Sequence, residues 1–143
     1  MKALSIREPW AHMVIHGLKT VEIRTWATHH RGPLLIHAAR QPDEAAARRF
    51  DLQGLPAGAL IGTVRLSEIE EFTPESWWAL AEEHLDPGPY TRKLYAWKLT
   101  DPEPLPQPIP WRGKPGVFDV EVDLDDPAVP EAEGENPAQG ALF

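Results

Sequence analysis

Hydrophobic and polar positions alternate most clearly over residues 19–26. In an extended chain, Val21 and Ile23 fall on one side, while Glu22 and Arg24 fall on the other. A period of two with β-branched residues on one face is typical of a half-buried strand. The segment therefore predicts a strand that turns one apolar face to the core and carries charged side chains on the other.

The residues before this strand follow a helical period instead. Trp10 and Val14 are four positions apart, as are two further apolar residues in the same stretch. Pro9 stands where a helix opens, and Gly17 stands where a C-terminal cap belongs. The pattern predicts a short helix over residues 9–16.

Similar reasoning places the other elements. Strands are predicted over residues 4–6, 34–38, 58–69, 94–99 and 117–124, and helices over residues 42–51 and 73–84. Gly62 interrupts its strand, which indicates a bulge or a barrel bend. Five prolines between residues 102 and 110 cannot belong to a central strand, so we expect an extended edge or surface segment there. About six strands and two to three short helices, with no βαβ rhythm, predict a mixed α+β, mainly β fold: a small barrel decorated by helices.

Composition and charge limit the functions that this fold could serve. A chain of 143 residues suits one domain, and without cysteine it has no thiolate ligand or nucleophile. The formal net charge is −8, yet the residues from 123 onward hold six acidic side chains and no basic one. Residues 1–49 carry eight basic and four acidic side chains, so the first third could present a basic face. We expect a folded domain over residues 1–124 and a disordered, acidic, proline-rich tail over 125–143.

The chain shows no sign of a membrane or secretory segment. No window approaches the roughly 20 apolar residues of a membrane span, and the N-terminus has no apolar signal-peptide core. We therefore expect a cytoplasmic protein that has no membrane partner. The oligomeric state is left open.

The charged strand face and its neighbours offer candidate chemistry. Glu22 and Arg24 project together, Lys19 lies just before them, and Arg7 and Trp10 arrive from the preceding corner. An indole can stack a base for about 1–3 kcal/mol, a cation can bind phosphate, and a carboxylate can accept from an exocyclic amine. A lysine beside a glutamate is also an acid–base pair. The alternative is a solvated charge cluster worth about 0–1 kcal/mol, with Trp10 as a plain packing anchor.

The histidines indicate no metal site. His12 and His16 have the i,i+4 spacing of a chelating pair, but no third ligand is evident, and no glutamate follows the first histidine. His37 lies in an apolar strand, where a hydrogen-bonded core histidine is the usual occupant. We expect no metal and no cofactor.

The segment Leu-Ser-Ile-Arg-Glu-Pro-Trp over residues 4–10, followed by Gly17-x-Lys19-x-x-Glu22-x-Arg24, resembles the ASCH domain family and its G-x-K-x-x-E-x-R signature. Weaker likeness continues through residues 31–38 and 110–118. The resemblance implies a PUA-like β-barrel with a cleft linked to RNA binding. The ligand-binding residues it implies are Arg7, Trp10, Lys19, Thr20, Glu22, Arg24 and Trp26.

The resemblance leaves three functions open. The first is binding of RNA or of a nucleobase and phosphate in a basic cleft, which we favour. The second is hydrolysis, either of N4-acetylcytidine or of single-stranded RNA, with Lys19 and Glu22 as catalytic residues. The amidohydrolase branch has threonine where this chain has Glu22, and its distant glutamate has no secure counterpart among Glu82, Glu83 and Asp86. The third is a regulatory module whose acidic tail meets a protein partner.

Overall fold

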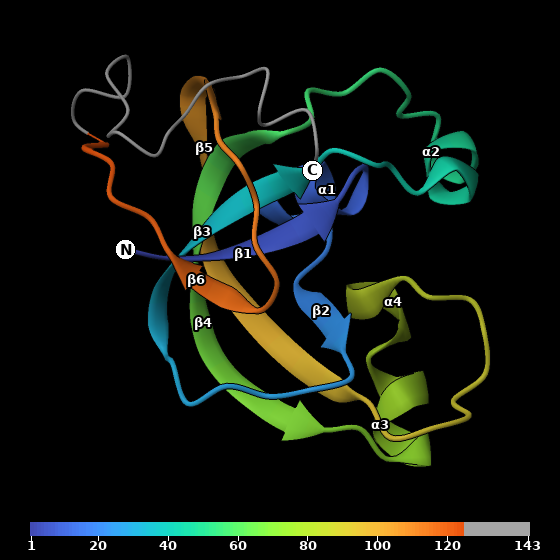
Figure 1. Ribbon diagram of the computed structural model, residues 1–143. Coiled ribbons are helices and arrows are strands. Elements are labelled where there is room, and N and C mark those ends of the chain that lie inside the picture. The colour runs from blue at the N-terminus through green and yellow to red at the C-terminus, as the bar shows by residue number, and fades with distance from the viewer. Residues whose placement is uncertain (125–143) are drawn as a thin grey trace.

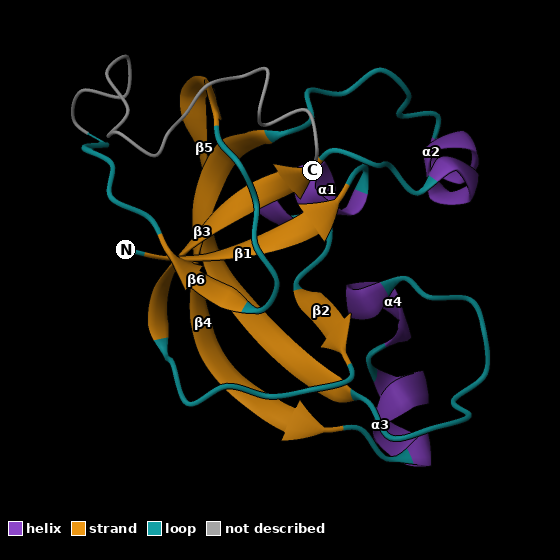
Figure 2. Cartoon of the chain, viewed as in Figure 1, coloured by secondary structure: helices purple, strands orange, loops and turns teal. Residues whose placement is uncertain are grey.

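Six strands and four short helices make up the part of the chain that the computed structural model describes, residues 1–124 (Figures 1 and 2). The predicted tail over residues 125–143 lies outside the described residues. In chain order the elements are β1 (Lys2–Arg7), α1 (Trp10–Ile15), β2 (Val21–Arg24), β3 (Gly32–Ala39), α2 (Glu44–Phe50), β4 (Ala59–Glu71), α3 (Pro74–Ala79), α4 (Ala81–His84), β5 (Tyr95–Pro110) and β6 (Val117–Asp119).

All six strands belong to one sheet in the order β2-β5-β4-β3-β1-β6. The pair β1–β3 is parallel and the other four pairs are antiparallel. The long strands β4 and β5 bend along their length, so the sheet curls into a half-barrel (Figure 1). The predicted fold class, mixed α+β and mainly β with a small barrel-like sheet and short helices, is confirmed.

The strand alternation sends side chains into separate clusters on the two faces of the sheet. On one face Leu4 and Ile6 pack with Val14 and Ile15 of α1, so this helix covers that face. On the other face Ala3 joins a second cluster made with Leu35, Leu60, Ile109, Trp111, Phe118 and Val120. A third cluster, around Phe72 and Trp77, joins α3 to the inner side of β2. The helix that precedes the charged strand is therefore fixed against the sheet.

Gly62 marks the bend that the sequence predicted. The register of β4 against β5 shifts between Leu60 and Gly62. A Cβ at Gly62 would lie 2.7 Å from Cγ2 of Ile15 and 2.8 Å from the carbonyl oxygen of Glu103. The missing side chain lets α1 sit directly on the sheet, a close backbone approach of the kind that glycine permits.

The proline run belongs to β5, whereas the sequence predicted a strand that ends at residue 99. The prolines stand at every second position, so the N–H groups they lack all belong to one edge. The run pairs with β4 at Pro104, opposite Gly62, and again at Ile109 and Pro110, with a break in register between these positions. Since β2 pairs only with residues 95–98, the run has a free outer edge. The position of the proline run at an edge was predicted correctly, but the predicted end of the strand at residue 99 was wrong.

Two other boundaries also differ from the prediction. The helix predicted over residues 73–84 is divided at Leu80, whose φ of −100° and ψ of 16° leave the helical region and turn its side chain toward the third cluster. The predicted cap at its start is present, because the Thr73 hydroxyl accepts from the N–H of Ser76. Strand β6 ends at Asp119, whereas the sequence predicted a strand to residue 124. Met1 and Val120 still exchange both backbone hydrogen bonds, which extends the pairing with β1 by one position.

Candidate functional site

A pocket of about 340 Å³ opens where β1, α1 and β2 meet the start of α2. Five of the seven residues that the sequence singled out for ligand binding line it: Arg7, Trp10, Glu22, Arg24 and Trp26. The remaining lining residues are Ser5, Ile6, Ile23, Thr25 and Asp43. Elements far apart in the sequence thus bring aromatic and charged side chains to one cavity, a combination typical of a site for a small polar ligand.

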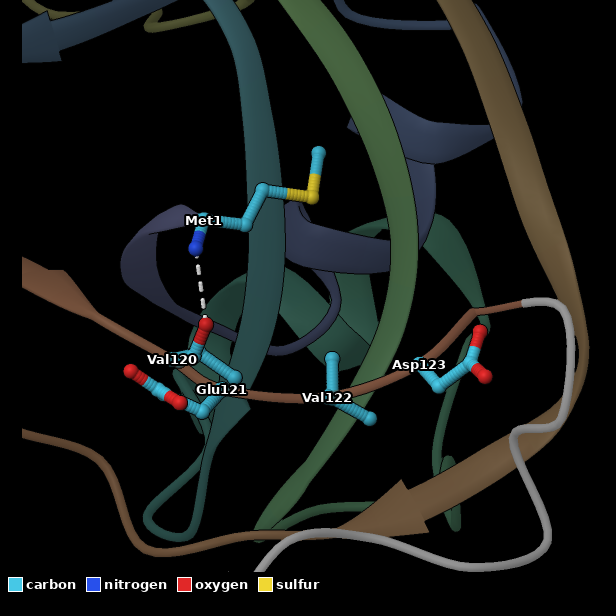
Figure 3. A pocket seen from close by; sticks show the side chains of 5 residues that line it. All are labelled: Met1, Val120, Glu121, Val122 and Asp123. Carbon is cyan, nitrogen blue, oxygen red and sulfur yellow. Dashed lines mark hydrogen bonds between the residues drawn. The ribbon is translucent and has the colours of Figure 1, made fainter.

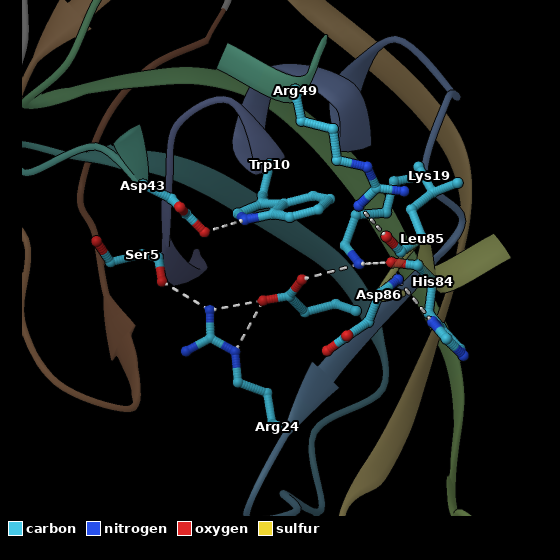
Figure 4. Close-up of polar contacts among 10 residues, drawn as sticks. Ser5, Trp10, Lys19, Arg24, Asp43, Arg49, His84, Leu85 and Asp86 are labelled. Carbon is cyan, nitrogen blue, oxygen red and sulfur yellow. Dashed lines mark hydrogen bonds and ion pairs between the residues drawn. The ribbon is translucent and has the colours of Figure 1, made fainter. Parts of the chain in front are cut away.

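Glu22 and Arg24 form a tight ion pair in the wall of this pocket. Oε2 of Glu22 lies 2.9 Å from Nη2 and 3.0 Å from Nε of Arg24, and the glutamate is only 7% exposed. Nη2 also donates to the carbonyl oxygen of Ser5 at 2.9 Å (Figure 4). The pairing of Glu22 with Arg24 that the sequence offered as an alternative therefore forms, but the pair is largely buried and not a solvated cluster. The guanidinium is fixed in place, and its Nη1 forms no hydrogen bond or ion pair with any residue of 1–124.

Lys19 lies behind the pocket wall and is not part of the lining. It is 3% exposed, and its Nζ donates to the carbonyl oxygen of His84 at 2.5 Å. The same ammonium is 3.8 Å from Oε1 of Glu22 and 4.9 Å from the ring centroid of Trp10. Burial lowers the pKa of Lys19, although the carboxylate of Glu22 opposes this effect. The lysine therefore holds both Glu22 and Trp10 from the inside.

Asp43, which was not among the residues singled out from the sequence, fixes the other side of Trp10. Its Oδ2 accepts from the indole N–H of Trp10 at 2.9 Å, while its Oδ1 caps α2 by accepting from the N–H of Ala46 at 3.1 Å. The hydrogen bond from Trp10 is the main reason that the pKa of Asp43 is lowered. The sequence signal was a helix N-cap, an aspartate directly before Glu44. No sequence pattern indicates that this N-cap residue also accepts a hydrogen bond from the indole of Trp10.

The remaining predicted residues lie in different surroundings. Trp26 packs edge-on against Trp97, with ring centroids 4.9 Å apart, and so forms a second aromatic wall. Arg7 is at the exposed rim, where it donates to the carbonyls of Gln41 and Pro42. Thr20 is exposed and outside the lining. Its backbone N–H and C=O bond to other backbone groups, so the structure does not bring its hydroxyl into the pocket.

The end of α4 anchors this site through three consecutive backbone carbonyls. The carbonyl of Glu83 accepts from the N–H of Thr20. Those of His84 and Leu85 accept from Nζ of Lys19 and Nη1 of Arg49 (Figure 4). The buried ring of His84 holds this segment together, since its Nδ1 accepts from the N–H of Asp86 while Nε2 donates to the carbonyl of Trp77. The charge of Asp86 also acts on Lys19. The anchor joins positions far apart in the chain, 65 residues for Lys19 and His84 and 36 for Arg49 and Leu85, beyond the reach of sequence spacing.

The histidines have structural surroundings. His37 is fully buried, its Nδ1 accepts from the Ser5 hydroxyl at 2.9 Å, and its Nε2 donates to the carbonyl of Trp111 at 2.7 Å. The rings of His12 and His16 lie 4.3 Å apart. Within residues 1–124, no three histidine, cysteine or acidic side chains gather as metal ligands would. In the same part of the chain, no helix has the length and apolar character needed to cross a membrane.

A second hollow of about 350 Å³ lies beside the N-terminus (Figure 3). Met1 and residues 120–123 line it, among them the carboxylates of Glu121 and Asp123. The terminal ammonium donates to the carbonyl of Val120 at 2.8 Å. This groove has two acidic side chains and no arginine or lysine in its lining, whereas Arg7 and Arg24 line the pocket beside Trp10, so that pocket is the stronger candidate for a nucleic acid.

Comparisons with known proteins agree with this architecture. The chain resembles the crystal structure of ASCH from Zymomonas mobilis, with a TM-score of 0.65 and 18% identity over 89% of this chain and 92% of that one. The crystal structure of a point mutant of the same protein matches with a TM-score of 0.57 and 22% identity, over 76% of this chain and 73% of that one. These likenesses show the fold.

Curated relatives were found in two mammals. The human protein named activating signal cointegrator 1 is 28% identical over 134 residues, and the mouse protein of that name is 26% identical over 132. Each alignment covers 82% of this chain but 22% of the relative, so the chain spans about a fifth of the length of these proteins. The model of the ASCH domain matches residues 4–108, a range that includes β1, the pocket and most of β5. The chain belongs to the ASCH domain family, whose members are in general RNA-binding.

Proposed function

We propose that this protein binds RNA by taking one base into the pocket between Trp10 and Trp26. The observation that carries the proposal is the composition of that pocket, in which two indoles share about 340 Å³ with the fixed Glu22–Arg24 pair. Indole faces stack any base, at about 1–3 kcal/mol for each. The Nη1 group of Arg24 can donate to a base carbonyl or to phosphate.

The acceptors of the pocket favour a base that carries an exocyclic amine. Glu22 is held beside two cations, Arg24 at 2.9 Å and Lys19 at 3.8 Å. The oxygens of a carboxylate accept hydrogen bonds. Asp43 adds a second acceptor in the lining. Cytosine, adenine and guanine present an amine to such groups, whereas uracil does not.

Binding of four single-stranded homopentanucleotides (C, A, G and U), measured by fluorescence anisotropy, tests the proposal. We expect Trp10→Ala to weaken the tightest complex by about 5- to 150-fold, the equivalent of one stacked base. Trp78→Ala is the matched control, because Trp78 is 65% exposed on α3 and lies outside the lining. If no pentanucleotide binds, or if both variants bind as the parent does, the proposal is wrong.

Hydrolysis is a second candidate function, and the Lys19–Glu22 pair is the observation that supports it. A buried lysine with a lowered pKa, 3.8 Å from a carboxylate, has the composition of an acid–base pair. Its position behind the lining, with Nζ bonded to the His84 carbonyl, favours binding over catalysis. Incubation with N4-acetylcytidine or with the pentanucleotides, followed by mass spectrometry, distinguishes the two functions. Release of cytidine and acetate, or of cleaved RNA, that is lost in both Lys19→Ala and Glu22→Gln would establish a hydrolase.

A further inference from the structure

The two ends of the Trp10 indole are flanked by cations on different elements. At the pyrrole end, the N–H bonds to Asp43, and the charge of Arg7 acts on that aspartate. The Arg7 guanidinium is held at the rim by its own bonds, from Nη2 to the carbonyl of Pro42 at 2.6 Å and from Nε to that of Gln41 at 3.2 Å. One exposed arginine therefore has a fixed position beside the mouth of the pocket.

At the other end, Arg49 lies outside the pocket lining, next to Phe50. Its guanidinium carbon lies 4.4 Å from the ring centroid of Phe50, whose ring packs edge-on against Trp10 at 5.5 Å. Nη1 of Arg49 donates to the carbonyl of Leu85 at 2.7 Å. Figure 4 shows Asp43 at one end of the indole and Arg49 with Lys19 toward the other. Arg49 is exposed, like its neighbour Arg48 on α2.

Both guanidiniums keep donors available for a ligand. Each has five N–H groups, of which Arg7 uses those on Nε and Nη2 and Arg49 one on Nη1. Their partners are carbonyls, and neither arginine forms an ion pair with a carboxylate in residues 1–124. Exposed arginines that keep their full charge and are oriented by backbone carbonyls suit phosphate, which accepts two N–H groups side by side.

We propose that Arg7 and Arg49 bind the phosphates on either side of the base in the pocket, so that the ligand is an internal nucleotide of single-stranded RNA and not a free nucleoside. This inference rests on the proposed function, because a base between Trp10 and Trp26 sets where its two phosphates emerge. A nucleotide with a phosphate on each side fits two cations at opposite ends of the indole. A paired base in a duplex cannot enter the pocket without leaving its stack.

The charges around the pocket determine which path the bound RNA takes over the protein surface. Asp86 lies on the opposite side of the Lys19 ammonium from Arg49 in Figure 4, and Glu82 and Glu83 are on α4. These carboxylates oppose a phosphate backbone that runs over α4. Arg48 and Arg49, at the end of α2, leave a basic route in the other direction. The strand therefore passes from the rim at Arg7, across the pocket, toward the end of α2.

The test compares the full chain with Arg7→Ala and Arg49→Ala, using the tightest homopentanucleotide and the nucleoside of the same base at four salt concentrations. We expect the parent to bind the pentanucleotide at least tenfold more tightly than the nucleoside. Each substitution should weaken pentanucleotide binding by about tenfold and reduce the salt slope of log Kd by about 0.7, the value for one phosphate contact on a single strand. Arg49→Ala should not change nucleoside binding, because Arg49 lies outside the pocket lining.

Two control variants, together with Trp10→Ala, keep the outcomes distinct. Arg65→Ala removes an equally exposed arginine on β4 and should leave the affinity and slope as they are. Arg49→Lys keeps the charge, so it should retain the slope even where the bond to the Leu85 carbonyl is lost. If Trp10→Ala abolishes pentanucleotide binding while both alanine variants keep the parental slope, this inference is overturned and the proposed function stands. If no pentanucleotide binds, both fail together.

Discussion

Glu8 is a carboxylic acid placed where water barely reaches it. The residue is 3% exposed, and Oε1 accepts from the N–H of His12 at 2.7 Å, in the first turn of α1. Burial raises the pKa of Glu8 from its ordinary value of 4.5 to about 7, although the bond from His12 opposes the shift. The folded protein therefore keeps this proton at pH values where the unfolded chain has released it.

This shift predicts a loss of stability between about pH 4.5 and 7. Because the folded state binds the proton more tightly, the free energy of unfolding falls as pH rises through this window and levels off above it. In Glu8→Gln this fall in the free energy of unfolding, on the order of 3 kcal/mol across the window, should be absent. The amide oxygen of glutamine still accepts from the N–H of His12, but the side chain does not titrate. Urea unfolding at pH 5 to 8 measures the difference between the two proteins. Parallel pH profiles would refute the assignment.

Some residue contacts follow from sequence spacing and others do not. The alternation of Glu22 and Arg24 predicted that their side chains project together, and they form an ion pair. No pattern showed that Arg24 would also bond to the carbonyl of Ser5, or that Lys19 would turn to that of His84. Those acceptors are 19 and 65 positions away and belong to the backbone, which has no residue-specific signal. Sequence spacing thus predicts which side chains are neighbours on one strand, whereas contacts with distant backbone carbonyls depend on the fold.

At the scale of elements, α1 is held against the bend in β4. The position of a Cβ at Gly62, 2.7 Å from Ile15 and 2.8 Å from the Glu103 backbone, leaves no room for even a methyl group. Gly62→Ala should lower the free energy of unfolding by about 1–3 kcal/mol, the usual cost of overpacking, because a backbone atom cannot rotate away. Thermal and urea unfolding measure this change.

The matched control is Gly88→Ala, where the nearest atom to a new Cβ is the Asp86 carboxylate at 3.2 Å. That atom ends a side chain that can turn aside, so we expect a smaller loss of stability. Equal effects at Gly62 and Gly88 would mean that α1 can shift to accept the methyl group. RNA affinity of the Gly62 variant is a second readout, since such a shift would also move Trp10.

Element boundaries were harder to predict than the elements themselves. Each of the six strands was expected close to its place, because alternation and glycine or proline punctuation are local signals. The length of β5 was not predicted, because a run of prolines normally indicates the end of a strand. Prolines can continue a strand that is paired along one edge only, and the sequence does not show that β5 is paired in this way. The division at Leu80 was not predicted either, because its apolar side chain also fits a continuous helix and the third cluster that it packs against includes residues distant in the chain.

At the scale of the molecule, charge separates by region. Basic side chains outnumber acidic ones over residues 1–49, which supply all of the pocket lining, although the whole chain carries −8. A polyanion responds to the nearby potential because charges beyond about 8–10 Å are screened at physiological salt. The total charge is therefore a poor guide to the partner, and the acidic residues from 125 onward become a test of which region binds.

A protein that ends at residue 124 should bind RNA at least as tightly as the full chain. The truncation removes five acidic residues and no basic one, so the formal net charge changes from −8 to −3. Weaker repulsion should raise the affinity most at low salt and have little effect near 0.5 M, where the Debye length is only about 4 Å. Anisotropy with the pentanucleotides measures the change. A full-length variant with the same five residues changed to asparagine or glutamine separates the effect of charge from that of chain length. If the truncated protein keeps its unfolding transition but loses all binding, residues 125–143 carry the function and the pocket does not.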